Sequence, residues 1–214
     1  MRCRLILGLI IVVAIVVSGC MTVSIHSKVN KDGDIDNYRM VINTSSMVYS
    51  ILSEQAKEEG YASLRESFMS NVSEEMEGKV TYDEEWSGDS VSIIVESKGQ
   101  PLEGGKLSIY KEGDYLVYDD STFSSEDGQE ELNEYGKQML SGFALHYYLE
   151  MPGKIVEANA NTIEDNKAEW HLTGADAFDA RIYAKSEIPT IPGFEVLMGL
   201  FALMIGLVVI GARR

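Results

Sequence analysis

Residues 22–43, TVSIHSKVNKDGDIDNYRMVIN, set the expected architecture of the chain. Apolar side chains share one phase of a two-residue period in residues 23–29 and again in residues 38–42, as in a strand with one buried face. Residues 31–34, Lys-Asp-Gly-Asp, supply a turn between the two runs. The segment therefore predicts an antiparallel β-hairpin.

A helical pattern follows this hairpin. Residues 43–46, Asn-Thr-Ser-Ser, offer several N-cap side chains, and apolar residues then recur at helical spacing in residues 47–56 and again in residues 61–76. Gly60 separates the two runs and Gly78 closes the second. We predict two helical segments; the alternative is one long helix broken at Gly60.

The rest of the chain returns to the period of strands, interrupted by turns rich in Gly, Asp and Ser. The expected strands lie at 80–82, 91–95, 107–109, 115–117, 143–149, 154–158, 168–173 and 178–185. The acidic stretch 119–134 is poor in large apolar side chains, so we expect a loop or a surface helix there.

These elements predict an α+β fold. Because strands outnumber helices, the helices are clustered and the strand connections look tight, we expect an antiparallel sheet with a helical pair packed on one face. Trp170, Tyr183 and Val156 each lie on the apolar phase of an expected strand. We therefore expect all three side chains to be at least mostly buried.

Charge divides the chain into a middle and two ends. The net charge of the 214 residues is −16, yet residues 5–17 and 196–212 carry no charge. Residues 21–190 hold 14 basic and 33 acidic side chains, a net charge of −19. A nucleic-acid binder needs clustered Lys and Arg, so that class is excluded, and the apolar ends exclude a cytosolic protein and a polytopic transporter. The acid excess fits a surface adapted to high salt, or a surface that captures cations at a cell wall.

The N-terminus has the parts of a secretory signal. Arg2 and Arg4 precede 13 apolar residues, which as a helix would reach about 20 Å, short of the ~30 Å hydrocarbon core of a bilayer. Residues 17–20, Val-Ser-Gly-Cys, resemble a lipobox. The resemblance implies that residues 1–19 are a signal peptide and that Cys20 becomes the lipid-modified first residue. A retained signal helix that acts as an anchor is the alternative.

The C-terminal residues 189–214 carry a second membrane signal. Pro192, Gly193 and Phe194 precede the apolar run 196–212 and a terminal pair of arginines. The run would form a transmembrane helix about 26 Å long, with the arginines in the cytoplasm, so a plain tail anchor is one interpretation. The combination also resembles the PGF-CTERM sorting signal of archaeal surface proteins. That resemblance implies that an archaeosortase removes the tail and joins the new end to a lipid.

Between the two signals, residues 20–188 are expected to form one extracytoplasmic domain. Residues 151–160, MPGKIVEANA, residues 168–172, AEWHL, and residues 182–186, IYAKS, resemble the closing part of the LppM-like lipoprotein domain. The opening hairpin resembles the start of that domain. The resemblance implies an envelope lipoprotein domain with no catalytic residues to carry over, in a family of which a few members are suspected of handling lipids or glycolipids.

The middle of the chain shows no catalytic or metal-binding motif. His26, His146 and His171 fall in three separate expected strands without a partner at ligand spacing, so we expect no metal site and no cofactor. Residues 30–36 bring oxygen ligands together but lack the glycine and the glutamate of an EF-hand loop. The sequence holds no nucleophile motif, no phosphate-binding glycine loop and no Cys-x-x-Cys pair, and we expect no enzyme.

Two further patterns concern the surface. Asn43 and Asn71 begin glycosylation sequons. Tyrosines are frequent in the second half of the chain, where they either line a ligand groove or belong to the core and its rim. These tyrosines are Tyr110, Tyr115, Tyr118, Tyr135, Tyr147 and Tyr148.

Together the patterns predict a surface-anchored, non-enzymatic lipoprotein of an archaeal envelope, at the extracytoplasmic face of the membrane. It would bind a lipid, a glycan or another envelope component, and its other partners would be the membrane, a signal peptidase and an archaeosortase-type enzyme. The alternative is a structural or assembly factor of the surface layer without a small-molecule ligand. A groove lined by Tyr and aliphatic side chains would favour binding, whereas a solid core would favour assembly.

A first prediction concerns the lipobox. Because Cys3 lies inside the signal, Cys20 is the only Cys of the expected mature chain, and Cys20→Ser should abolish thioether-linked lipid. Mass spectrometry of the protein isolated from its own membrane measures this. A wild-type chain that begins at Ser18, or at an unmodified Met21, would contradict the assignment.

Overall fold

The opening segment forms the hairpin that its pattern predicts. β1 (Met21–Val29) pairs antiparallel with β2 (Ile35–Ser45), and Gly33 in the turn has a φ of 95°, which glycine adopts without strain. The computed structural model describes three stretches of the chain, residues 21–99, 106–124 and 141–189.

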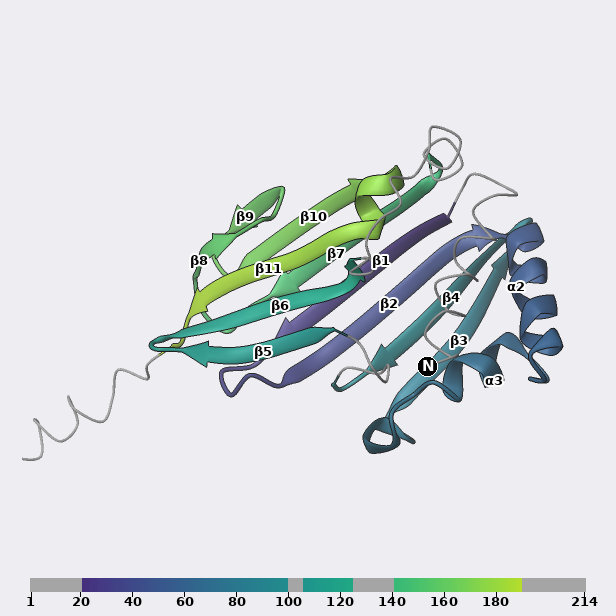
Figure 1. Ribbon diagram of the computed structural model, residues 1–214, viewed down its shortest axis with the longest axis horizontal. Coiled ribbons are helices and arrows are strands. Elements are labelled where there is room, and N and C mark those ends of the chain that lie inside the picture. The colour runs from purple at the N-terminus through teal and green to yellow at the C-terminus, as the bar shows by residue number, and fades with distance from the viewer. Residues whose placement is uncertain (1–20, 100–105, 125–140, 190–214) are drawn as a thin grey trace, which may run out of the picture.

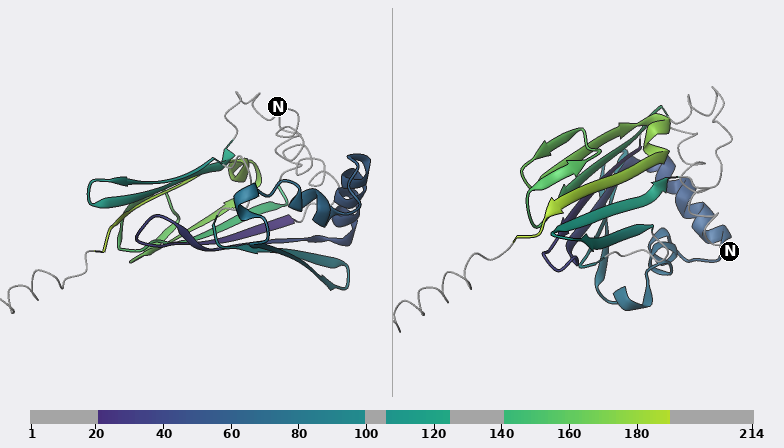
Figure 2. Two further views of the ribbon diagram at one scale, coloured as in Figure 1. Left: turned by 90° about the horizontal axis from the view of Figure 1, so that it is seen from below. Right: turned by 60° about the vertical axis from the view of Figure 1, so that its left-hand side comes forward.

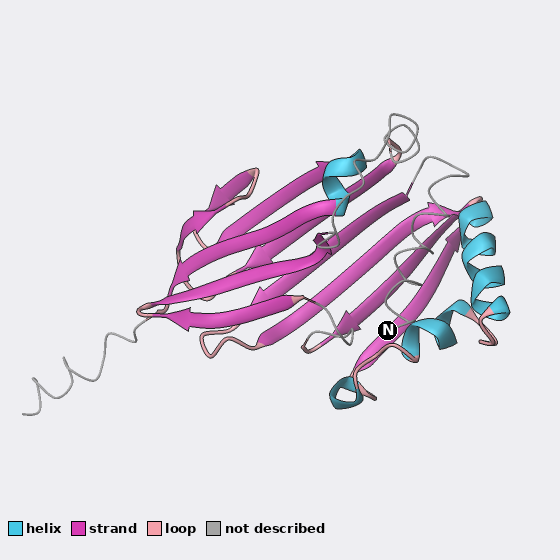
Figure 3. Ribbon diagram, in the orientation of Figure 1, coloured by secondary structure: helices cyan, strands magenta, loops and turns pink. Residues whose placement is uncertain are grey.

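Most of the described residues are strand (Figure 3). One sheet has seven strands in the order β3-β4-β2-β1-β7-β10-β9, and the other has four in the order β5-β6-β11-β8. The further strands are β3 (Val80–Ser87), β4 (Ser90–Ser97), β5 (Leu107–Glu112), β6 (Tyr115–Ser124), β7 (Phe143–Glu150), β8 (Ile155–Ala158), β9 (Thr162–Glu164), β10 (Lys167–Thr173) and β11 (Asp179–Glu187). The helices are α2 (Ser46–Glu58) and α3 (Leu64–Met69), with short 3₁₀ turns η1 (Glu74–Met76) and η2 (Gly174–Phe178).

One strand pairing differs from the expected antiparallel sheet. β1 pairs parallel with β7, from Met21 opposite Phe143 to Lys28 opposite Glu150. A two-residue period shows only that one face of a strand is buried, so it identifies neither the partner of the strand nor its direction. The chain forms β2 to β6 before it returns as β7, and β1 consequently lies inside the larger sheet (Figure 1).

The smaller sheet and both helices lie on the same face of the larger sheet (Figure 2). The helices cover the β2, β3 and β4 end of that face, and the smaller sheet covers the side formed by β1, β7 and β10. The predicted α+β fold with helices on one face is therefore confirmed only in part. A second sheet, which the periodicity could not separate from the first, covers the rest. The opposite face of the larger sheet, here called the outer face, is not covered by any described element.

The helical region is shorter than the pattern predicts. α2 begins after Ser45, whose side chain caps its first turn as expected. The second segment, expected at 61–76, contains only α3 and η1. Ser63 caps α3, and the Glu66 carboxylate accepts a hydrogen bond from the Ala62 amide (2.6 Å), so the helix begins at residue 64.

The acidic stretch 119–134 begins as a strand, not as the expected loop or surface helix. β6 continues to Ser124, and Arg181 of β11 donates two hydrogen bonds of 2.7 and 2.8 Å to Asp119. These bonds lower the pKa of Asp119. A basic partner on the next strand thus allows acidic residues within a sheet, and composition alone does not reveal that partner. Residues 125–134 lie outside the described part of the chain.

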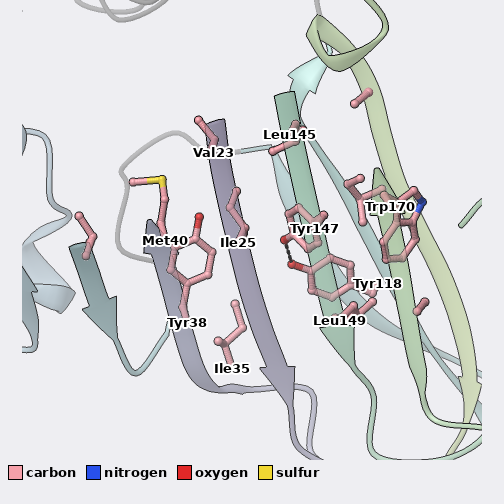
Figure 4. Close-up of a cluster of buried hydrophobic side chains, with 14 of the residues drawn as sticks. Val23, Ile25, Ile35, Tyr38, Met40, Tyr118, Leu145, Tyr147, Leu149 and Trp170 are labelled. Atoms are coloured by element: carbon pink, nitrogen blue, oxygen red, sulfur yellow. Dashed lines mark hydrogen bonds between the residues drawn. The ribbon is translucent and has the colours of Figure 1, made fainter. Parts of the chain in front are cut away.

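The core between the two sheets is apolar except for one polar network. Figure 4 shows Tyr147 of β7 and Tyr118 of β6 pointing toward each other, and their hydroxyls are hydrogen-bonded. The Tyr147 hydroxyl donates to Asp120 (3.0 Å), and Ser27 of β1 lies 3.4 Å from the Tyr118 hydroxyl. All four side chains are buried, and burial raises the pKa of both tyrosines, so both remain protonated donors. The network joins β1 and β7 of the larger sheet to β6 of the smaller one.

Trp170 of β10 is buried as expected, with 2% of its surface exposed. Its Nε1 donates to the Asn159 side-chain oxygen (2.9 Å), which also accepts the backbone amide of Tyr183 (2.9 Å). Asn159 in turn donates to the carbonyl of Arg181 (2.6 Å). One asparagine therefore connects β10 of the larger sheet to β11 of the smaller sheet.

The expectation that Val156 is mostly buried is wrong, whereas Tyr183 is mostly buried, as expected. Val156 is 49% exposed while its neighbour Ile155 faces the core, and Tyr183 has intermediate exposure beside the fully buried Ile182. Both strands contain consecutive apolar residues at this point. Alternation alone cannot say which of two apolar neighbours points inward, and packing of the smaller sheet decides it.

The membrane signals lie outside the described residues. These are the lipobox with Cys20, the Pro192-Gly193-Phe194 tripeptide and the expected helix 196–212. Within residues 21–99, 106–124 and 141–189, no helix has the length and apolarity needed to cross a membrane.

The core assignment is tested by a matched pair of substitutions. Trp170→Ala should lower the free energy of unfolding by about 3–5 kcal/mol, because it empties a large buried aromatic site. Val156→Ala, on the exposed side of β8, should change it by less than about 0.5 kcal/mol. Guanidinium unfolding of a fragment spanning residues 21–188 measures both values. A loss below about 1 kcal/mol for Trp170→Ala would place the indole at the surface.

Candidate functional site

A hollow of about 430 Å³ opens where α2 and α3 meet the end of β3. The elements that surround it, α2, α3 and the end of β3, lie on the right in Figure 1. Its lining combines aromatic, hydroxyl and charged side chains, and we name it the Trp86 hollow. The lining residues are Tyr49, Ser50, Ser53, Glu54, Lys57, Ala62, Ser63, Leu64 and Trp86.

Trp86 is the most unusual member of this set. It lies opposite the buried Val91 of β4, on the strand phase that faces the core, yet it is 54% exposed. Tyr49 of α2 contacts its ring edge-to-face, with 4.8 Å between centroids. An indole that is held by one neighbour and otherwise faces a hollow presents an apolar surface and an N–H donor to a ligand.

Glu84 fixes the aromatic wall of the hollow. Its two carboxylate oxygens accept hydrogen bonds from the hydroxyls of Tyr49 (2.7 Å) and Tyr82 (2.9 Å). Burial, and secondly the hydrogen bond to Glu84, raises the pKa of both tyrosines, which therefore remain donors at neutral pH. Because α2 and β3 are tied through this carboxylate, Tyr49 holds Trp86 in place.

The floor and rim of the hollow are polar. α2 contributes the hydroxyls of Ser50 and Ser53 and two opposite charges, Glu54 and Lys57. Ser63 at the start of α3 adds a third hydroxyl. The hollow can therefore donate and accept hydrogen bonds while an aromatic ring covers one side, which suits a polar ligand with an apolar face.

A second hollow, of about 470 Å³, lies at the other rim of the domain. It is formed by the β1–β2 turn, the end of β4 and the edge strand β5, and its lining includes Ile35, Leu107, Ile109 and Lys98. Residues 100–105, which lie outside the described residues, directly follow this wall in sequence. We take the Trp86 hollow as the candidate site because it combines an exposed indole with convergent hydroxyl and charged groups.

The three histidines, which fall far apart in the sequence, come together on the outer face. His26 of β1 stacks on Tyr148 of β7 (4.4 Å between centroids), and the edge of Tyr148 contacts His171 of β10. His146 of β7 lies beside His171, with 2.8 Å between their Nδ1 atoms. The pKa of His26 is lowered, first by partial burial and then by Arg39, so its ring is neutral at neutral pH.

The other residues singled out in the sequence are placed as follows. Asn43 is exposed at the end of β2 and accepts a hydrogen bond from Ser92 (2.7 Å), and Asn71 follows α3 and donates to the carbonyl of Ser67 (2.8 Å). Cys20 and the Pro192-Gly193-Phe194 signal lie outside the described residues.

Of the two alternatives for the tyrosines of the second half, a ligand groove or the core and its rim, the described residues favour the second, and none of these tyrosines lines the Trp86 hollow. Tyr118 and Tyr147 are in the core, Tyr110 and Tyr115 are exposed on the smaller sheet, and Tyr148 is on the outer face. Tyr135 lies outside the described residues. Sequence reasoning missed Tyr49 and Trp86. The sequence did contain a signal for Trp86, because a tryptophan that follows three acidic residues near the end of a strand is an unusual member of a core.

With this geometry in place, comparison with known proteins identifies the family. The chain is 59% identical over 205 residues to a protein of Archaeoglobus fulgidus described as uncharacterized, which covers 95% of this chain and 94% of that protein. The chain belongs to the family of this archaeal protein. No family model matches the chain.

Among solved structures, the chain is similar to the NMR structure of the folded domain of LppM from Mycobacterium tuberculosis. The TM-score is 0.47 and the sequence identity 12%, over 80% of this chain and 91% of that domain. LppM is also the family that the sequence resembles.

The exposure of Trp86 is testable by fluorescence, because the chain contains only two tryptophans. In a Trp170→Phe variant, the remaining Trp86 should emit at long wavelength and be readily quenched by iodide, since water and ions reach it. In a Trp86→Phe variant, the buried Trp170 should emit at shorter wavelength and resist quenching. Equal quenching of the two variants would mean that the Trp86 hollow is closed in solution.

Proposed function

We propose that the protein is an anchored lipoprotein of an archaeal envelope whose extracytoplasmic domain binds an envelope glycan in the Trp86 hollow, without catalysing a reaction. The observation that carries this proposal is the half-exposed Trp86 at the wall of a hollow lined with hydroxyls and charges. An exposed aromatic ring beside a hollow with several convergent polar groups is the usual setting of a small-molecule site.

The chemistry of the lining favours a glycan over an acyl chain. A sugar ring has an apolar face that packs on an indole and a rim of hydroxyls that bond to serine, carboxylate and ammonium groups. An acyl chain would instead cover Glu54, Lys57 and the serine hydroxyls without hydrogen-bonding to them, which costs free energy. The volume of about 430 Å³ also lies within the range of small-molecule sites, roughly 300–1,000 Å³.

The position of the chain ends supports anchoring of the domain at both ends. β1 starts at Met21, opposite Phe143 at the start of β7, and β11 ends at Glu187, whose amide bonds to Lys154 just beyond the other end of β7. Cys20 and the tail from residue 189 would therefore leave the domain at opposite ends of its strands, about 30 Å apart for nine residues. Two such anchors hold a protein stably where a single lipid chain holds it marginally.

The distribution of catalytic groups supports binding over hydrolysis. The serines of the Trp86 hollow lie on one side of the larger sheet, and all three histidines lie on the outer face. A serine–histidine pair needs the imidazole within hydrogen-bond reach of the hydroxyl, and the sheet separates these serines from the three histidines. The 59% identity to a protein of Archaeoglobus fulgidus supports the archaeal part of the proposal.

The proposal is tested by titrating the Trp170→Phe variant with glycans released from the envelope glycoproteins and glycolipids of the source cells. Emission of Trp86 should change saturably. Lys57→Ala and Glu54→Gln should each weaken binding about tenfold, since a hydrogen bond to a charged group contributes roughly 1.5–3 kcal/mol. Ile163→Ala, at an exposed position on β9, serves as the matched control and should bind normally.

Two outcomes would contradict the proposal. A glycan response that survives Trp86→Ala would place the binding site elsewhere on the domain. Absence of any saturable response, together with cross-links from the domain to other surface-layer proteins, would favour the alternative of an assembly factor.

A further inference from the structure

The outer face carries a second arrangement of functional groups that the Trp86 hollow does not use. β1, β7 and β10 are neighbours in the larger sheet (Figure 1), and His171 lies directly opposite His146 in the antiparallel pairing of β10 with β7. Directly opposed residues of paired strands point to the same side of a sheet, with Cβ atoms about 5 Å apart. The two imidazoles therefore meet over the sheet, and we name them the histidine pair.

The two ring nitrogens are at hydrogen-bond distance, and this distance is also close to the spacing of two ligands of one metal ion. The Nδ1 atoms are 2.8 Å apart. Two nitrogens that each lie ~2.0–2.1 Å from a metal are about 2.9 Å apart when they subtend a right angle, and about 3.4 Å apart at a tetrahedral angle. The histidine pair matches the right angle, which is the geometry of square-planar copper(II) and nickel(II) sites.

The surroundings of His171 orient it for this role. Its second ring nitrogen, Nε2, faces the Glu169 carboxylate at 3.4 Å, a contact that favours the tautomer with the ring proton on Nε2. In that tautomer, Nδ1 of His171 can accept either a hydrogen bond from His146 or a metal ion. Tyr148 packs edge-on against the same ring, with 5.8 Å between centroids, and limits its rotation.

We propose that the histidine pair binds a transition-metal dication, copper(II) before nickel(II) and zinc(II), with Nδ1 of His146 and Nδ1 of His171 as ligands. The ion replaces the hydrogen bond between the rings, and the proton of His146 moves to its Nε2. Among the described residues, no third His, Cys, Asp or Glu joins the pair in a metal-binding group, so water completes the coordination. Copper(II) leads because nitrogen sites bind it most tightly among these ions, and because zinc prefers a closed tetrahedral set.

The charge of the protein favours this site. The chain has a net charge of −16, which raises the local concentration of cations around the domain. The histidine pair is also accessible, since 41% of the His171 side chain and 43% of the Glu169 side chain are exposed. Metal binding on the outer face is independent of the Trp86 hollow, so failure of either proposal leaves the other intact.

The test uses the mature chain purified in detergent without a histidine tag and freed of metal with EDTA. Titration with copper(II) chloride should give one site per chain, and its electron paramagnetic resonance spectrum should show coupling to two nitrogens. His146→Ala and His171→Ala should each weaken copper binding at least about tenfold, because each removes one of the two protein ligands. Glu169→Gln should weaken binding about tenfold through the orientation of His171.

His26→Ala is the matched control. His26 is exposed on the same face and stacks on Tyr148, but its ring does not join the histidine pair. Copper affinity should therefore be unchanged in this variant. Circular dichroism of every variant should match the wild type, since these side chains project from the sheet into water.

The proposal is overturned if copper binds His146→Ala as tightly as the wild type, because the ion would then be held elsewhere. It is also overturned if the wild-type spectrum shows a single nitrogen or only oxygen ligands, a readout that does not depend on any variant. Tighter binding of zinc(II) than of copper(II) would contradict the right-angle geometry.

Discussion

The parallel pairing of β1 with β7 is the contact on which the rest of the structure depends. It joins the first strand of the domain to one that follows five intervening strands and two helices, and it places β1 inside the larger sheet. The buried network follows from it, because Ser27 and Tyr147 come from these two strands and meet Tyr118 of the smaller sheet. The arrangement of the outer face also follows from this pairing, because His26 of β1 stacks on Tyr148 of β7.

The sequence predicts local structure here better than it predicts pairing. The hairpin, the Ser45 cap and the burial of Trp170 are local consequences of periodicity and side-chain chemistry, and each is confirmed. Division of the strands into two sheets is not local, because it depends on which buried faces fit together. Val156, which was expected to be mostly buried and is exposed, shows the same limit. Where two adjacent residues are apolar, the pattern does not say which of them faces the core.

The two candidate sites differ in the same way, since one is formed by elements close in sequence and the other depends on strand pairing. The Trp86 hollow is built from three elements that are close in sequence, so its residues could have been assembled from the pattern had the indole been recognised as lacking a core partner. The histidine pair could not have been assembled from the sequence pattern. His146 and His171 are separated by β8 and β9, and only the register of β10 against β7 brings them opposite each other. A search for ligand spacing along one strand or helix cannot find ligands that meet across strands.

The two sites lie on opposite faces of one sheet, and this gives the domain two independent surfaces. The inner face holds the aromatic and hydroxyl groups beside the helices, and the outer face holds the imidazoles. A sheet with one covered and one open face can change its open face without loss of core packing, because alternate residues of each strand serve the two sides. Substitutions at the outward-facing positions of β7 and β10 can therefore alter the outer face and leave the buried network unchanged.

The placement of Met21 and Glu187 at opposite ends of the strands also determines how the domain bears mechanical load. A pull applied between the two ends acts along the axes of β1 and β11, each of which lies between two hydrogen-bonded neighbours. Such a force shears the whole ladder of each strand at once, whereas a perpendicular pull would open it one bond at a time. A domain held at both ends in an envelope under stress would resist stretching in the direction in which its sheets are strongest.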